Sequence, residues 1–153
     1  MSVTHAGFTI ERRFGCTPAK AFRAFSDPEL KRQWFANPSN RPDDQWRLDF
    51  RVGGGEVNVG GAPDEPPHTF KSRFHDIVED ERIVFTYDLL FGDRLVSVSL
   101  ATIEFHPDGD GTRLVFTEHG AFFDDLEDPA GREHGTGKLL DALERVLGGE
   151  AVR

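Results

Sequence analysis

The chain has 153 residues and a mass of 17.1 kDa, the size of one domain. Acidic residues outnumber basic ones by 27 to 18, and the net charge of −9 argues against nucleic acid as a partner. The longest apolar runs have three residues, and the first residues lack the pattern of a signal peptide. We therefore expect neither a membrane span nor secretion, and the lone Cys16 favours the reducing cytoplasm.

The first predicted element is a strand from Phe8 to Phe14, where apolar and polar residues alternate. Two pairs of a capping residue and a proline follow, Thr17-Pro18 and Asp27-Pro28, and each pair is typical of a helix start. Apolar residues at helical spacing continue to Trp34. The chain therefore opens with one strand and two short helices.

The middle of the chain alternates between strand patterns and turns. The polar, proline-rich stretch from Asn37 to Asp44 predicts a loop. Strands are predicted after it over residues 46–50, 57–59, 69–78, 82–91, 95–105 and 112–119, of which the second is weak. The last turns are short enough for hairpins, so neighbouring strands should be antiparallel.

The last segment has the period of a helix. Asp128-Pro129 marks its start, and its leucine-rich face continues to Leu147 before Gly148-Gly149 ends it. Three glycines interrupt the first half, namely Gly131, Gly135 and Gly137, and the buried face there is small and polar. We expect this half of the helix to leave space above the sheet.

Together these elements predict an α+β fold in a single domain of residues 1–153, with its core in residues 8–147. A curved antiparallel sheet of six or seven strands would wrap around the long final helix. The 14 phenylalanines, two tryptophans and one tyrosine predict a wide aromatic interior. We therefore expect a cavity between the sheet and the helix.

Several stretches resemble one known superfamily. They are residues 18–30 with Trp34-Phe35, His75-Asp76-Ile77-Val78, Ser97-Val98-Ser99-Leu100, residues 111–114, Thr117 to Phe122, and Gly135 to Leu140. The superfamily is the helix-grip one, which includes START-related lipid-transfer domains, polyketide cyclases and pollen-allergen-like proteins. Within it the chain is most similar to bacterial members of the activator of heat-shock-protein ATPase homologue group.

The resemblance implies a protein with a cavity, but one scaffold in this superfamily carries lipid carriers, cyclases, hormone receptors and cochaperones. Eukaryotic cochaperones of the group also have a separate amino-terminal domain, and the residues before Phe8 leave no space for one. We therefore expect a small apolar or amphipathic ligand, and rank a chaperone partner behind it.

The residues expected around the cavity lie on the inward-facing positions of the strands and on the inner face of the last helix. They are Arg12, Trp34, Phe50, Phe74, Phe85, Tyr87, Phe105, Phe116, Glu118, Arg132, Gly135, Thr136 and Leu140. The six histidines are dispersed, so neither a metal site nor a cofactor is expected.

Glu118 is the candidate catalytic residue, because it shares a strand face with Leu114 and Phe116. A buried carboxylate needs a partner. Arg132 is one candidate, and the resemblance implies that Arg12 is another, since the first and last strands of this superfamily are neighbours. An ion pair should keep the pKa of Glu118 low, whereas an unpaired Glu118 should have a raised pKa suited to acid–base catalysis.

Three functions remain open from the sequence. The preferred one is binding of a small molecule in the cavity. The second is an enzyme of cyclase or hydrolase type that uses Glu118, with Tyr87 or His75 as further candidates. The third is a module that acts on a chaperone or another protein partner.

Overall fold

The computed structural model describes residues 2–36, 42–43 and 45–148, so most of the loop predicted between Asn37 and Asp44 lies outside the described residues. The elements in chain order are β1 (Val3–Phe14), α1 (Pro18–Ser26), α2 (Pro28–Trp34), β2 (Gln45–Leu48), β3 (Gly55–Gly60), β4 (His68–Val78), β5 (Arg82–Phe91), β6 (Arg94–Asp108), β7 (Gly111–Phe123) and α3 (Pro129–Val146).

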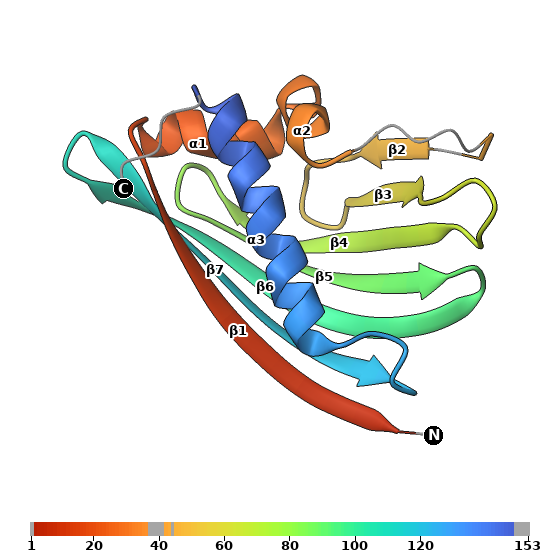
Figure 1. The fold of residues 1–153 in the computed structure, drawn as a ribbon. Coiled ribbons are helices and arrows are strands. Elements are labelled where there is room, and N and C mark those ends of the chain that lie inside the picture. The colour runs from red at the N-terminus through yellow and green to blue at the C-terminus, as the bar shows by residue number, and fades with distance from the viewer. Residues whose placement is uncertain (1, 37–41, 44, 149–153) are drawn as a thin grey trace.

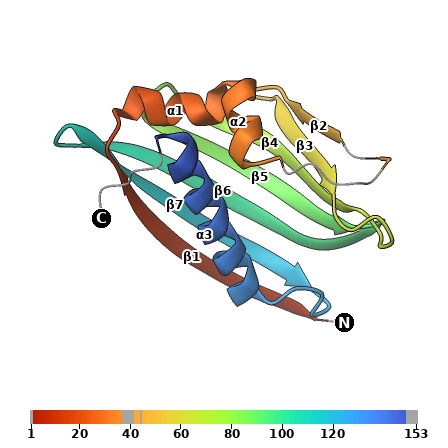
Figure 2. The same cartoon turned by 45° about the horizontal axis from the view of Figure 1, so that its top comes forward.

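The described strands form one sheet in the order β1-β7-β6-β5-β4-β3-β2, and every neighbouring pair is antiparallel. The sheet is curved, and α3 crosses its concave face (Figure 1). Helices α1 and α2 lie together along one end of the sheet (Figure 2). This arrangement confirms the predicted α+β, helix-grip fold.

Each helix begins where a side-chain cap and a proline predict it. The Thr17 hydroxyl accepts a hydrogen bond from the backbone N–H of Lys20 at 3.3 Å. The Asp27 and Asp128 carboxylates cap α2 and α3 in the same way. Asp27 accepts from the backbone N–H of Glu29 and Asp128 from that of Ala130, each at 3.0 Å. These bonds satisfy N–H groups that the first turn leaves unpaired.

Strands β1, β7 and β2 differ from their predicted lengths. β1 begins at Val3 and β7 continues to Phe123, because these two residues pair with each other at the end of a shared ladder. Backbone pairing extends both strands beyond the apolar alternation that predicts them. β2 is shorter and ends at Leu48, so that Phe50 lies in the turn that leads to β3.

A cluster of aromatic rings fills the core beneath α1 and α2. The rings of Phe22 and Phe25 meet Phe105 of β6 edge-on at 5.5 and 5.4 Å between centroids. Trp34 packs on Phe25 at 4.9 Å, and its indole N–H donates to the Ala24 carbonyl at 2.9 Å. Edge-to-face contacts of this kind add to the stabilisation from burial.

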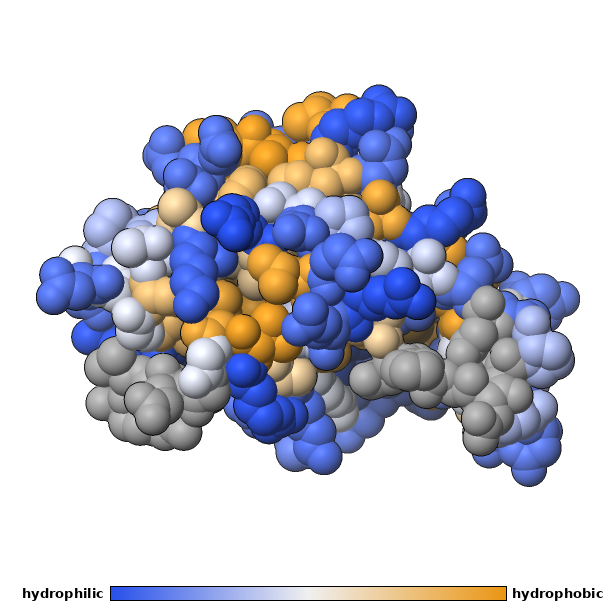
Figure 3. Space-filling model, turned by 90° about the horizontal axis from the view of Figure 1, so that it is seen from above, coloured by the Kyte–Doolittle hydropathy of each residue, from blue (hydrophilic) through white to orange (hydrophobic). Residues whose placement is uncertain are grey.

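The face that carries α1 and α2 is seen from above in Figure 3, where apolar residues reach the surface among charged ones. Across the described residues, we find no helix with the length and apolar character needed to cross a membrane.

Candidate functional site

A pocket lies between the concave face of the sheet and the helices. Its walls come from all three helices, from strands β3 to β7 and from the turn after β2. The lining residues are Phe25, Lys31, Trp34, Phe35, Phe50, Glu56, Phe70, Phe74, Ile83, Phe85, Tyr87, Ile103, Phe116, Glu118, Thr136, Leu139 and Leu140.

The pocket is small, with a cavity volume of about 60 Å³. That is room for a few water molecules, and less than half of the roughly 150 Å³ cavity that accepts benzene. Phe35, Phe70 and Phe85 are only partly buried. A ligand larger than a few atoms would therefore have to displace these rings.

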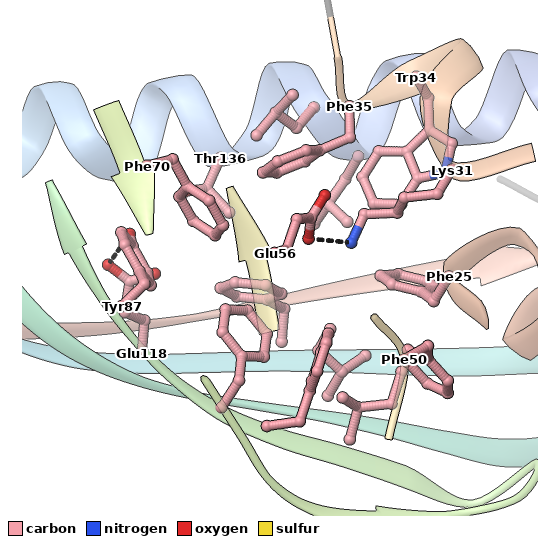
Figure 4. A pocket seen from close by; sticks show the side chains of 17 residues that line it. Phe25, Lys31, Trp34, Phe35, Phe50, Glu56, Phe70, Tyr87, Glu118 and Thr136 are labelled. Atoms are coloured by element: carbon pink, nitrogen blue, oxygen red, sulfur yellow. Dashed lines mark hydrogen bonds and ion pairs between the residues drawn. The ribbon is translucent and has the colours of Figure 1, made fainter. Parts of the chain in front are cut away.

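One end of the pocket is acidic (Figure 4). Glu118 comes from β7 and is 2% exposed, and Tyr87 on β5 donates its hydroxyl hydrogen to Glu118 Oε2 at 2.8 Å. Among the described residues, the other carboxylate oxygen, Glu118 Oε1, is buried without a hydrogen-bond partner. An unsatisfied buried acceptor is costly, so a hydrogen-bond donor at Oε1 would stabilise this end of the pocket.

Arg132 of α3 lies behind this end, outside the pocket lining. Its Nε and Nη2 atoms donate to the two oxygens of Glu127 at 2.7 and 2.9 Å, and Nη2 also donates to Ser97 at 2.7 Å. Its Nη1 atom faces three acceptors, which are Tyr87 at 2.8 Å and both Ser99 and Glu118 at 3.3 Å. Because Nη1 has only two hydrogens, Glu118 receives a minor share of this cation.

Burial dominates the electrostatics of this end. It raises the pKa of Glu118, and the hydrogen bonds from Tyr87, Arg132 and Ser99 together with the charge of Arg132 do not offset it. The pKa of Tyr87 is raised by burial and by the nearby Glu118 charge, so the phenol keeps its proton. Burial lowers the pKa of Arg132, but the bond to Glu127 and the surrounding negative charges raise it by a larger amount, so the pKa lies above its ordinary value.

The sequence left two alternatives open for Glu118, and the structure combines a part of each. Glu118 does meet an arginine, Arg132, at 3.3 Å, yet its pKa is raised rather than lowered. The expectation of a low pKa assumed a whole arginine for one carboxylate. In the structure Glu127 takes the two shortest charged contacts of that arginine.

The wall of the pocket also holds a complete ion pair (Figure 4). Lys31 of α2 approaches Glu56 Oε1 of β3 at 3.0 Å, and both side chains are buried. The second oxygen, Glu56 Oε2, accepts the indole N–H of Trp46 at 2.9 Å. The Lys31 ammonium also lies 4.6 to 5.5 Å from the centres of the Phe25, Trp34 and Phe35 rings.

Most of the residues predicted for the cavity lie together along the pocket. These are Trp34, Phe50, Phe74, Phe85, Tyr87, Phe116, Glu118, Thr136 and Leu140. Phe105 instead packs in the core beneath α1, and Arg132 reaches the pocket only through Glu118 and Tyr87.

Arg12 and Gly135 are not where the sequence placed them. Arg12 binds the Gly137 carbonyl at 3.2 Å and Asp141 at 3.1 Å, on the outer side of α3. The residue opposite Glu118 on β1 is Phe8, so the Arg12 backbone is about 13 Å further along the strand. Gly135 is exposed, with open space where a Cβ would be, so it faces solvent and does not enlarge the pocket.

Lys31 and Glu56 escaped the sequence analysis because charged residues on short elements are usually exposed. One signal points to Lys31, which is three residues before Trp34 and so shares its helix face. We find no comparable signal for Glu56. Within the described residues, no group of three metal-binding side chains is placed to hold a metal ion.

The chain is similar to known proteins in sequence and in fold over most of its length. Residues 15–148 match the sequence pattern of the family described as Activator of Hsp90 ATPase homolog 1-like protein. The structure of Mll3558 from Rhizobium loti is similar, with 44% identity and a TM-score of 0.88 over 95% of this chain and 99% of that one. A protein from Rhizobium leguminosarum has 40% identity and a TM-score of 0.90 over 97% and 98%.

More distant structures share the fold alone. SA2116 from Staphylococcus aureus, described as a protein of unknown function, has 16% identity and a TM-score of 0.77 over 96% of each chain. No curated protein gives a significant match to the sequence.

Proposed function

The chain belongs to the Activator of Hsp90 ATPase homolog 1-like family, and from that premise we propose that it binds a small apolar or amphipathic molecule in the pocket between the sheet and α3. The observation that carries this proposal is Glu118 Oε1, a buried acceptor without a partner among the described residues, on a mostly apolar wall. A core that served only packing would gain nothing from a carboxylate there. A ligand with an apolar body and one polar group would satisfy both parts of the wall.

Entry of a ligand would involve the rings at the edge of the pocket. Phe35 stacks edge-on against Phe70 at 5.0 Å, and both rings are partly exposed. Phe35 follows directly after the last residue of α2, Phe70 belongs to β4, and both line the pocket. Movement of these two rings would enlarge the cavity without disturbing the core beneath α1.

Two neighbouring residues of α3 allow a controlled test. Thr136 is buried and lines the pocket, whereas Gly135 is exposed. Thr136→Leu should fill the pocket and weaken the binding of toluene. NMR titration of the full chain with toluene measures this binding. Gly135→Leu adds the same side chain on the solvent side and should leave binding as in the parent. Equal toluene affinity in the parent and Thr136→Leu would show that binding occurs elsewhere.

The natural ligand can be sought directly. Native mass spectrometry of protein purified from its own cells should show a retained molecule whose mass adds to that of the chain. Thr136→Leu prepared in the same way should lack the added mass. We place this binding in the cytoplasm, where a chain with the single Cys16 needs no disulfide.

A second candidate function is catalysis by Glu118. It is supported by the raised pKa of the buried carboxyl and by its bond to the Tyr87 hydroxyl, an arrangement suited to a general acid or base. Glu118→Gln would then retain ligand binding but abolish turnover of the retained molecule. A chaperone partner, the third candidate, has support from family membership alone.

A further inference from the structure

Two carboxylates line the pocket, and their surroundings differ. Both oxygens of Glu56 are bonded, one to the Lys31 ammonium and the other to the indole of Trp46. Oε2 of Glu118 accepts hydrogen bonds from Tyr87 and Arg132, while Oε1 is buried without a partner among the described residues. The binding capacity left on the wall is therefore at Glu118 Oε1.

The charge at that end is not balanced. Arg132 contacts Glu118 and also makes a bidentate contact with Glu127. One positive charge therefore faces two carboxylates, and Glu127 takes the shorter bonds. When Glu118 is ionised, this cluster has an excess of one negative charge, which attracts a cation or a strong hydrogen-bond donor.

Aromatic rings surround the same end of the pocket. Phe70 lies 4.7 Å from the Tyr87 ring and Phe85 lies 6.0 Å from it. Phe116 is two residues before Glu118 on β7 and lines the pocket with it. The faces of such rings attract organic cations, and the attraction increases where water is excluded.

The protein already binds one ammonium group in this way. Lys31 is held in the same pocket by one carboxylate oxygen of Glu56 and by three rings. The Glu118 end also has a carboxylate and aromatic rings. Its cation, the guanidinium of Arg132, lies over the Tyr87 ring and bonds to Oε2, so that Oε1 has no cation bonded to it among the described residues. This internal counterpart indicates what chemistry the free oxygen can accept.

We infer that the ligand of the pocket is an apolar molecule with a protonated amine, whose N–H group donates to Glu118 Oε1 while its body lies among the aromatic rings. This inference rests on the proposed binding function and specifies its ligand class. An anionic ligand is disfavoured, because both cations near the pocket are already bonded to carboxylates. A purely apolar ligand would leave Oε1 without a partner.

Four probes of similar shape test the inference: benzylamine, benzyl alcohol, toluene and benzoate. Their dissociation constants for the full chain should be measured by NMR titration at neutral pH. Benzylamine should bind about tenfold more tightly than toluene, the ratio expected from one hydrogen bond to a charged group. Benzoate should bind most weakly.

Two variants identify the group responsible. Glu118→Gln should abolish the preference for benzylamine over toluene while toluene still binds. Glu127→Gln should also reduce the preference, because it releases Arg132 to neutralise Glu118. Toluene affinity in each variant reports whether the pocket itself is intact.

The possible outcomes distinguish a failure of the amine assignment from a failure of the proposed binding function. Equal affinities for benzylamine and toluene, or a preference that persists in Glu118→Gln, would overturn the amine assignment and leave a ligand-binding pocket. Benzyl alcohol binding as tightly as benzylamine would also overturn it, in favour of a neutral donor. If none of the probes binds, toluene included, the proposed function fails and the inference fails with it.

Discussion

Lys31 of α2 and Glu56 of β3 form a buried ion pair on the pocket wall, with 3.0 Å between Nζ and Oε1. Lys31→Met keeps most of the side-chain volume, and among the described residues it leaves the Glu56 carboxylate with the Trp46 indole as its one side-chain partner. Breaking a buried pair from one side costs about 3 to 5 kcal/mol. Urea denaturation of the variant should show a loss of this size in the free energy of unfolding.

The double variant Lys31→Met/Glu56→Gln is the control. It removes both charges and keeps an acceptor for Trp46, so it should recover most of the lost stability. Equal instability of the single and double variants would contradict this account. The loss would then come from the packing of the lysine stem against the rings.

Trp34 is both a core residue and part of the pocket wall, and it is 5% exposed. Trp34→Ala should reduce the free energy of unfolding by about 3 to 5 kcal/mol, the usual cost of truncating a large buried ring. Trp34→Phe keeps most of the ring packing and loses the bond to Ala24, so its cost should be clearly smaller. A denaturation midpoint for Trp34→Ala near that of the parent, at an unchanged slope, would refute core packing.

The raised pKa of Glu118 predicts a pH dependence of stability. The folded protein keeps the Glu118 proton to a higher pH than the unfolded chain does, so unfolding releases a proton between the two pKa values. Across that interval the free energy of unfolding of the parent should fall with rising pH relative to Glu118→Gln. Tyr87, Ser99 and Arg132 face the carboxyl and are unchanged in the variant.

Urea denaturation of both proteins at several pH values between about 4 and 8 measures this difference, and the other titrating groups cancel. A carboxyl-carbon NMR titration gives the Glu118 pKa directly. A pKa below the ordinary glutamate value, or a difference between the proteins that rises with pH in the parent's favour, would contradict the prediction.

Gly135 is the simplest place to stabilise the fold. It lies inside α3, it is exposed, and a Cβ there would meet no atom within 4 Å. Gly135→Ala should therefore raise the free energy of unfolding by up to about 1 kcal/mol, measured as a higher denaturation midpoint. Gly55→Ala provides the contrast, because its Cβ would overlap the Ser72 carbonyl oxygen, and this variant should be less stable than the parent.

The start of each helix could be predicted because it is determined by adjacent residues. Thr17, Asp27 and Asp128 are each followed by proline, and cap and proline act within one turn. The beginning of β1 at Val3 could not be predicted in this way. It depends on pairing with Phe123, and no local pattern contains that partner.

The same distinction applies to the site. Alternation along β7 is sufficient to turn Glu118 inward, and the helical period is sufficient to turn Arg132 and Thr136 inward. Choosing between Arg12 and Arg132 as the partner requires the register of β1 against β7, which places Phe8 opposite Glu118. The competition from Glu127 depends on how the chain bends before α3, and the sequence pattern does not specify that bend.

The order of the sheet puts the first strand beside the last one. Val3 pairs with Phe123 and Phe14 with Thr112, so most of the chain separates the two sides of this ladder. On the ribosome, β1 emerges first and remains without its partner until β7 has been synthesised. Closing so long a loop costs entropy before any contact is gained, which makes this pairing a slow and late step of folding. Until then neither edge of β1 is paired, whereas one edge is covered by β7 in the folded sheet, so the nascent chain is more exposed to aggregation in that interval.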